Sequence, residues 1–320
     1  LSEGAHPVLP AKTTSFKHWA EALAEYAQTD AMHAELDTWL HAAERSSEPL
    51  PYDHELGPNS LLSTDTVSTA LSAEETGVLL KEVPGVFRTE INDVLLTALV
   101  QAISVWTGEK ALSVTLEGHG REDLIPDTDL SRTVGWFTSM FPVHLSFSGA
   151  ENTAGRLKAV KEQLRAIPNR GVGYGLLRWL SADEKVGEQL TAGPVPDISF
   201  NYLGQFDQMT SQSLWFGPAD EPTGKLHGRG ERQHVLDIVS VVNGGRLTVS
   251  WTYSRNLHTH TKVEWLAEEY LKALRAIIAA SREGQSADYT PADFKRAKLN
   301  QQTLDKIMNQ VAGRNRRDPK

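Results

Sequence analysis

The sequence of 320 residues contains no cysteine and no long hydrophobic run. The absence of cysteine excludes disulfide scaffolds, thiolate zinc sites and cysteine nucleophiles. A membrane-spanning helix needs about 18 or more consecutive apolar residues, and no stretch of the chain approaches that length. The N-terminus also lacks the basic and then apolar pattern of a signal peptide. We therefore expect a soluble, cytoplasmic protein that does not insert into a membrane.

Several catalytic and nucleotide-binding motifs are missing as well. The chain has no Gly-x-Ser-x-Gly elbow, no His-Glu-x-x-His helix and no Gly-x-x-x-x-Gly-Lys phosphate loop. The glycine-rich segment 171–175 fails the dinucleotide fingerprint because Leu176 comes directly after it, so we interpret it as a loop that needs positive φ or close backbone approach. His258 and His260 have no third ligand nearby, and the sequence predicts no metal site.

The net charge of −9 is unevenly distributed along the chain. Residues 291–320 hold eight basic and three acidic residues, which leaves −14 for residues 1–290. A body of that charge repels phosphates, and this argues against nucleic acid as a partner. The basic tail has apolar residues partly at helical spacing between Asp293 and Val311. Such a tail fits either a linker with a solvated helix or a short docking helix for an acidic partner.

The spacing of apolar residues predicts a mixed α/β chain with a lobe boundary near residues 60–70. Helices are expected over about 16–26, 31–44, 73–83, 91–107, 152–166 and from 261 onward, and strands over 67–71, 112–116, 141–147, 198–202, 235–242 and 246–254. Capping boxes at Ser72 and Thr261 are expected to open two helices, and Pro84 to end the first of them. Alternation over 112–116 predicts a half-buried strand, and Asn243-Gly244-Gly245 predicts a hairpin.

Polar residues cluster at the ends of three of these strands. Residues 117–122 place two carboxylates, an imidazole and a guanidinium around two glycines. This cluster fits a surface turn closed by a salt bridge, or a carboxylate held at the mouth of a cleft for general acid/base work. Residues 131–142 and 199–207 combine polar and aromatic side chains at a strand entry and a strand exit. Each of these two segments also fits ordinary packing.

Five segments in this order resemble the motifs of one family. They are Asn-Asp-Val-Leu-Leu at 92–96, Glu-Gly-His-Gly-Arg-Glu at 117–122, Arg-Thr-Val-Gly-Trp-Phe-Thr at 132–138, Pro-Asn-Arg-Gly-Val-Gly-Tyr-Gly at 168–175 and Phe-Asn-Tyr-Leu-Gly-Gln-Phe-Asp at 200–207. The chain resembles the epimerization domain of nonribosomal peptide synthetases, a branch of the condensation-domain superfamily. The second and fifth segments favour epimerization over peptide-bond formation.

The resemblance implies a chloramphenicol-acetyltransferase-like α/β (α+β) fold, in which two lobes enclose a tunnel for the 4'-phosphopantetheine arm of a carrier domain. It implies inversion at Cα of an aminoacyl or peptidyl thioester, with Glu117 as one acid/base group and no cofactor bound by the domain itself. The residues implied to bind substrate or support the site are His119, Arg132, Trp136, Tyr174, Asn201 and Tyr202. The implied partners are a peptidyl carrier domain, adjacent adenylation and condensation domains, and a downstream synthetase subunit that contacts residues 295–320.

The family's second essential group lies in a His-His-x-x-x-Asp-Gly motif, and no two histidines of this chain are adjacent. The segment 12–16 resembles the residues that come after that motif in the family, so we expect an N-terminally truncated domain that is inactive alone. Residues 1–65 would be the remaining part of the N-terminal lobe, 66–290 the C-terminal lobe, and 291–320 a linker or docking helix. Two alternatives remain: a condensation domain that forms peptide bonds, and a non-catalytic carrier-binding remnant.

Overall fold

A computed structural model describes residues 9–45, 48–206, 230–283, 289–297, 300, 302–304 and 306–308. The chain forms two compact units whose segments alternate along the sequence. The first unit comprises residues 1–44, 117–141 and 168–194, and the second comprises 45–116, 142–167 and 195–320. Among the described helices, none is long and apolar enough to cross a bilayer. The lobe boundaries expected at residues 65 and 290 stay predictions.

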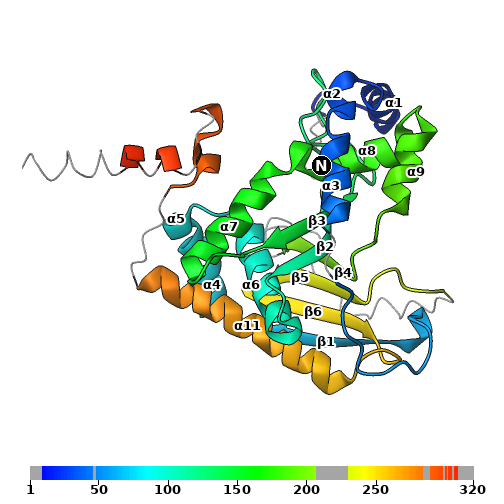
Figure 1. Ribbon diagram of the computed structural model, residues 1–320. Coiled ribbons are helices and arrows are strands. Elements are labelled where there is room, and N and C mark those ends of the chain that lie inside the picture. The colour runs from blue at the N-terminus through cyan, green and yellow to red at the C-terminus, as the bar shows by residue number, and fades with distance from the viewer. Residues whose placement is uncertain are drawn as a thin grey trace, which may run out of the picture. The chain divides into compact units, whose positions relative to one another are not determined.

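The second unit is built on a mixed six-stranded sheet with the order β1-β6-β5-β4-β2-β3 (Figure 1). Its strands are β1 (Thr64–Ala70), β2 (Ala111–Gly118), β3 (Ser139–Ser146), β4 (Ile198–Gln205), β5 (Leu236–Asn243) and β6 (Arg246–Ser254). β4 runs parallel to both β2 and β5, whereas β6 runs antiparallel to β5 and β1. This mixture of parallel and antiparallel strands confirms the α/β class expected from the sequence.

Helices of the second unit cover one face of this sheet (Figure 1). They are α4 (Ala73–Lys81), α5 (Val83–Phe87), α6 (Ile91–Thr107), α7 (Thr153–Ala166) and α11 (His260–Arg282). Ile238 of β5 pairs with Trp251 of β6, and both are buried. The Trp251 ring meets Tyr270 of α11 edge to face at 5.7 Å. The opposite face carries hydroxyl side chains, such as the Ser68–Ser250 pair, whose Oγ atoms are 3.0 Å apart.

The first unit is mainly helical. Its helices are α1 (Phe16–Tyr26), α2 (Asp30–His33), α3 (Leu36–Glu44), α8 (Val172–Leu180) and α9 (Glu184–Ala192), with a 3-10 turn η2 (Pro168–Gly171) before α8. Two further 3-10 turns, η1 (Leu61–Ser63) and η3 (Pro291–Ala297), belong to the second unit. Trp39 of α3 is buried among the rings of Phe141 and Tyr174.

Local signals set several element ends where the sequence predicts them. The side chains of Ser15 and Ser72 cap α1 and α4, and the latter forms the expected capping box with Glu75. Gly108 ends α6 in the left-handed conformation. The β5–β6 hairpin turns through Gly244 and Gly245, both with positive φ, as a two-residue loop of this kind requires.

Other expectations for the helices are wrong. The helix expected over 31–44 is broken between α2 and α3, where the Glu35 carboxylate turns inward and accepts a hydrogen bond from Trp39 Nε1 at 3.2 Å. Pro84 lies in the first turn of α5, where its missing N–H costs no hydrogen bond. Thr259 caps α11 in place of Thr261, because Asp53 fixes the hydroxyl and the N–H of Thr259.

Two further expectations concern burial and the glycine-rich segment. Ser113 and Thr115 are buried, as are the apolar residues Leu112, Val114 and Leu116 that alternate with them, so β2 is covered on both faces rather than half-buried. An interior strand that pairs in parallel is commonly covered in this way. The segment 171–175 is a loop only at Gly171, because α8 begins at Val172.

The first residues of the predicted C-terminal tail are tied to α7. Lys161 of α7 is buried, and its ammonium donates to Asp293 at 2.7 Å. The same carboxylate accepts from the N–H of Thr290 at 2.9 Å. The side chains of residues 295–299 and all of residues 309–320 lie outside the described part of the chain. The docking helix expected there therefore stays a prediction.

Tyr253 of β6 provides a test of the second unit at alkaline pH. Burial and the nearby Asp65 carboxylate raise the pKa of Tyr253 to about 12. An unfolded tyrosine ionises near pH 10, so between pH 10 and 12 the unfolded chain loses this proton while the folded chain keeps it. We expect the free energy of unfolding to fall with rising pH in that window, and to fall less in Tyr253→Phe. Urea unfolding of both proteins from pH 9 to 11.5 measures this, and identical slopes would contradict it.

Candidate functional site

The end of β2 carries the predicted catalytic carboxylate. Glu117 is the last residue but one of β2 and is half-buried. A Cβ on Gly118 would lie 2.9 Å from Ser139 Oγ, and a Cβ on Gly120, which has a φ of +67°, would lie 1.6 Å from the carbonyl oxygen of Phe137. The backbone of Phe137 therefore requires a glycine at position 120, and Gly118 fits closely against the Ser139 hydroxyl. Two of the motif segments thus pack directly against each other.

His119 is held at both ring nitrogens. Its Nδ1 accepts a hydrogen bond from the N–H of Arg121 at 3.0 Å, which leaves the proton of the neutral ring on Nε2. Nε2 lies 3.2 Å from Glu122 Oε1. Because both nitrogens are used within the loop, His119 can shape the loop, and this arrangement leaves neither nitrogen for substrate.

Arg121 also serves the loop. Its guanidinium donates to the carbonyl oxygens of Leu130 and Thr133 and stacks over the ring of Phe137 at 3.9 Å. Glu122 forms an ion pair with Arg170 and also lies within hydrogen-bond distance of the His119 ring. The salt bridge expected for the cluster 117–122 is therefore present at Glu122, in the C-terminal half of the cluster.

Three other predicted site residues also lie in the first unit. Arg132 donates to the carbonyl oxygen of Ala11 at 3.0 Å. Trp136 is 82% exposed, which is unusual for a tryptophan. The ring of Tyr174 on α8 meets Trp39 edge to face, and its hydroxyl accepts from Arg178 at 3.3 Å. Their roles at the site stay predictions.

Asn201 and Tyr202 are consecutive residues of β4 in the second unit, so their side chains leave opposite faces of the sheet. Both are half-buried, and burial raises the pKa of Tyr202, which keeps its phenol protonated as a hydrogen-bond donor. Leu116 of β2 pairs with Phe200 of β4. The residues that follow them, Glu117 and Asn201, belong to different units.

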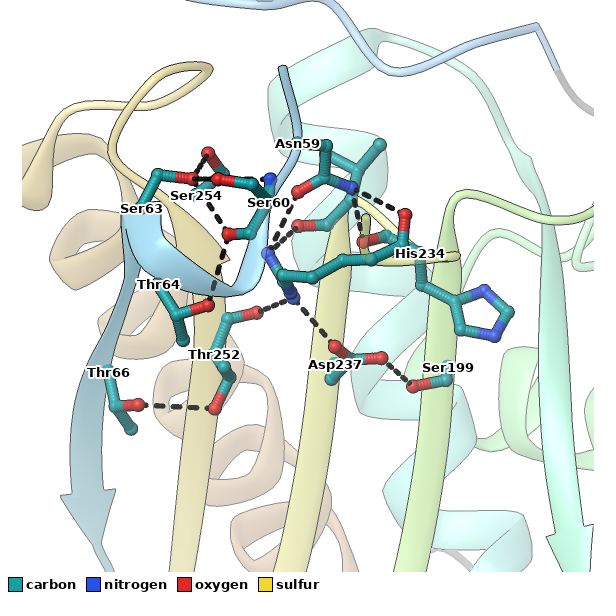
Figure 2. A network of polar contacts seen from close by, with 12 residues as sticks. Asn59, Ser60, Ser63, Thr64, Thr66, Ser199, His234, Asp237, Thr252 and Ser254 are labelled. Atoms are coloured by element: carbon teal, nitrogen blue, oxygen red, sulfur yellow. Dashed lines mark hydrogen bonds and ion pairs between the residues drawn. The ribbon is translucent and has the colours of Figure 1, made fainter. Parts of the chain in front are cut away.

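A partly buried polar network fixes the start of β4 and β5 (Figure 2). The Arg232 guanidinium donates to Asp237 of β5 at 2.6 Å and to the carbonyl oxygen of Thr252 at 2.9 Å. Ser199 of β4 donates to the other oxygen of Asp237 at 2.6 Å, and Asn59 accepts from Arg232 at 3.2 Å. The network thus holds β4 two residues before Asn201.

This network was not predicted from the sequence, and neither were the contacts of Glu35, Asn169, Arg170 and Glu122 in the first unit. The motif segments were the only sequence features that pointed to these residues. Contacts between residues far apart in the chain produce no regular spacing in the sequence. Within the described residues, no group of three or more histidine, aspartate and glutamate side chains could hold a metal ion.

Gly120→Ala tests the packing of the loop. An alanine there is strained by the left-handed backbone, and its Cβ clashes with the backbone of Phe137. We expect the free energy of unfolding to fall by about 2–3 kcal/mol. Gly149→Ala is the matched control, because Gly149 has a φ of +84° but open space around its Cβ position. It should cost only about 1–2 kcal/mol, the strain of the left-handed backbone. Equal losses in urea unfolding would show that the predicted clash is absent.

Comparisons with known proteins define the class. The family model of the condensation domain matches residues 1–300. The chain belongs to the condensation domain family, and its α/β fold is the chloramphenicol-acetyltransferase-like fold of that family.

The relatives are nonribosomal peptide synthetase subunits. The chain is 47% identical over 308 residues to one subunit of the linear gramicidin synthase of Brevibacillus parabrevis, covering 95% of this chain and 4% of that subunit. It is 41% identical over 311 residues to surfactin synthase subunit 1 of Bacillus subtilis (strain 168), covering 96% and 9%. The chain therefore spans a small fraction of these proteins.

Among solved structures, the epimerization domain from the third module of tyrocidine synthetase B is similar, with a TM-score of 0.80 and 37% identity. The match covers 89% of this chain and 64% of that one. The two proteins are therefore similar in both fold and sequence.

Proposed function

We propose that the chain is part of an epimerization domain that inverts Cα of an aminoacyl or peptidyl thioester on a carrier protein. The observation that carries the proposal is the loop 117–122, which places Glu117 at the end of β2 and is locked by Gly120 against Phe137. The 37% identity to a solved epimerization domain supports the same activity. The four other motif segments add to this support.

The chemistry requires two acid/base groups. A thioester acidifies the α-hydrogen because the charge delocalises into an enolate, and inversion needs a proton removed from one face and returned to the other. Glu117 is the proposed group on one face. Asn201 and Tyr202, whose phenol stays protonated, leave opposite faces of β4. One of them is proposed to donate a hydrogen bond to the enolate oxygen or to the amide of the substrate, and the other to support the site. The second acid/base group is proposed to come from a His-His-x-x-x-Asp-Gly segment outside these 320 residues.

The substrate is proposed to arrive on the 4'-phosphopantetheine arm of a peptidyl carrier domain, so the domain itself needs no cofactor. Neighbouring adenylation and condensation domains, and a subunit that contacts residues 295–320, are the further proposed partners. Binding of a downstream subunit that is unchanged after deletion of residues 295–320 would contradict the last of these.

Product analysis tests the proposed function. The full gene product is incubated in D2O with a carrier domain loaded with an L-aminoacyl thioester, and the thioester is hydrolysed and separated on a chiral phase. We expect deuterium at Cα and a mixture of L and D products. An L product without deuterium would contradict epimerization.

The runner-up function is condensation, because the matching family model is that of the condensation domain as a whole. The same assay with donor and acceptor carriers separates the two functions. A dipeptidyl thioester without Cα exchange would select condensation.

A further inference from the structure

The turn before α8 has an unusual backbone. Asn169, Arg170 and Gly171 have φ values of +44°, +50° and +89°, three consecutive left-handed residues of which two carry side chains. Left-handed non-glycine residues persist only where surrounding contacts hold them, and they concentrate at functional sites. The contacts that hold this turn, and the side chain that the turn positions, can therefore indicate its function.

A buried carboxylate holds the turn. Asn169 donates its side-chain amide to Glu35 Oε1, and the other carboxylate oxygen accepts from Trp39 Nε1 at 3.2 Å. Glu35 is only 7% exposed. A Cβ on Gly173 would lie 2.0 Å from Glu35 Oε2, so a glycine is needed there to admit the carboxylate. Glu35 is therefore built into the turn by three separate features.

The turn presents Arg170 to the loop that carries Glu117. Arg170 Nε lies 3.6 Å from Glu122 Oε2, and the other oxygen of Glu122 lies 3.2 Å from His119 Nε2. The backbone also comes close, since a Cβ on Gly118 would lie 3.7 Å from the carbonyl oxygen of Arg170. The side chain of Glu122 is 16% exposed and that of Arg170 is 67% exposed.

An exposed ion pair adds little to stability, and it does not require a left-handed backbone. The strained backbone of the turn therefore indicates that Arg170 must be held in one position. We infer that Arg170 is a positioning residue for Glu117, acting through Glu122 and His119, with Glu35 and Asn169 holding Arg170 in place. This inference rests on the proposed role of Glu117.

The test compares Cα deuterium exchange and unfolding in the full gene product. Arg170→Ala is expected to lower kcat for exchange about tenfold or more with little change in KM, and to leave the urea midpoint unchanged. Arg170→Lys should retain part of the activity, and the charge exchange Arg170→Glu with Glu122→Arg should recover part of what Arg170→Glu alone loses. Lys17→Ala is the control, since Lys17 makes an exposed ion pair with Glu21 at 3.0 Å on α1 of the same unit.

Asn169→Gly separates positioning from stability. Glycine accepts the left-handed backbone without strain but leaves Glu35 Oε1 without its donor, so the two effects on the urea midpoint oppose each other. We therefore expect kcat to fall by more than the loss of folded protein explains. Unchanged kcat in Arg170→Ala, or a loss of kcat matched by loss of folded protein, would overturn the positioning role alone. A wild type that shows no Cα exchange would overturn the proposed function and this inference together.

Discussion

Glu117→Gln is expected to lower the rate of Cα proton exchange by about 10²–10⁴-fold, the usual contribution of a positioned general acid or base. Glutamine keeps the size of the side chain but cannot accept or release the proton. Because the change is nearly isosteric at the half-buried end of β2, the fold should persist. The loss should therefore appear in kcat rather than in the amount of folded protein.

The measurement is deuterium incorporation at Cα of a carrier-bound aminoacyl thioester in D2O, made on the full gene product. Glu109→Gln is the control, because Glu109 is an exposed carboxylate just before the other end of β2. It should exchange at the wild-type rate. Exchange by Glu117→Gln within twofold of wild type would remove Glu117 from the acid/base pair, even if the chain epimerizes.

The order of elements and the motif segments could be predicted from the sequence because both depend on local information. Apolar spacing located α6 within a residue, and Ser72 with Glu75 located the start of α4. The break between α2 and α3 could not be predicted, since it depends on the contacts of Glu35 with Asn169, which lies 134 residues away. The propensity of the segment for a continuous helix is overridden there by tertiary contacts.

The candidate site divides in the same way. Glu117 and the glycines beside it could be found from one short segment, and the structure explains why those glycines are needed. Arg232 and Arg170 could not be found, because the features that mark them are the ion pair of the buried Arg232 side chain with Asp237 in one case and a left-handed backbone in the other. Neither feature produces a recognisable pattern in the sequence. Fold class is thus easier to predict than the residues that support a site.

The motif segment 92–96 contains a residue whose role is structural. Asp93 at the start of α6 is fully buried, and its carboxylate receives Arg165 of α7 at 2.9 and 2.8 Å in a bidentate pair. The same carboxylate accepts from the N–H of Glu90 at 2.7 Å, which closes the first turn of α6. Asp93 therefore joins two helices and caps one of them, a function that a motif match alone does not reveal.

Arg165→Met is expected to lower the free energy of unfolding by about 3–5 kcal/mol, because it leaves the carboxylate of Asp93 buried without its charged partner. Arg282→Met is the control: Arg282 pairs with Glu74 at 3.5 Å on the surface, and an exposed pair contributes about 0–1 kcal/mol. The double variant Asp93→Leu with Arg165→Met removes both charges and should be more stable than Arg165→Met alone. Urea unfolding at pH 7 measures all of them. A loss for Arg165→Met no larger than that for Arg282→Met would show that the buried pair does not hold α6 to α7.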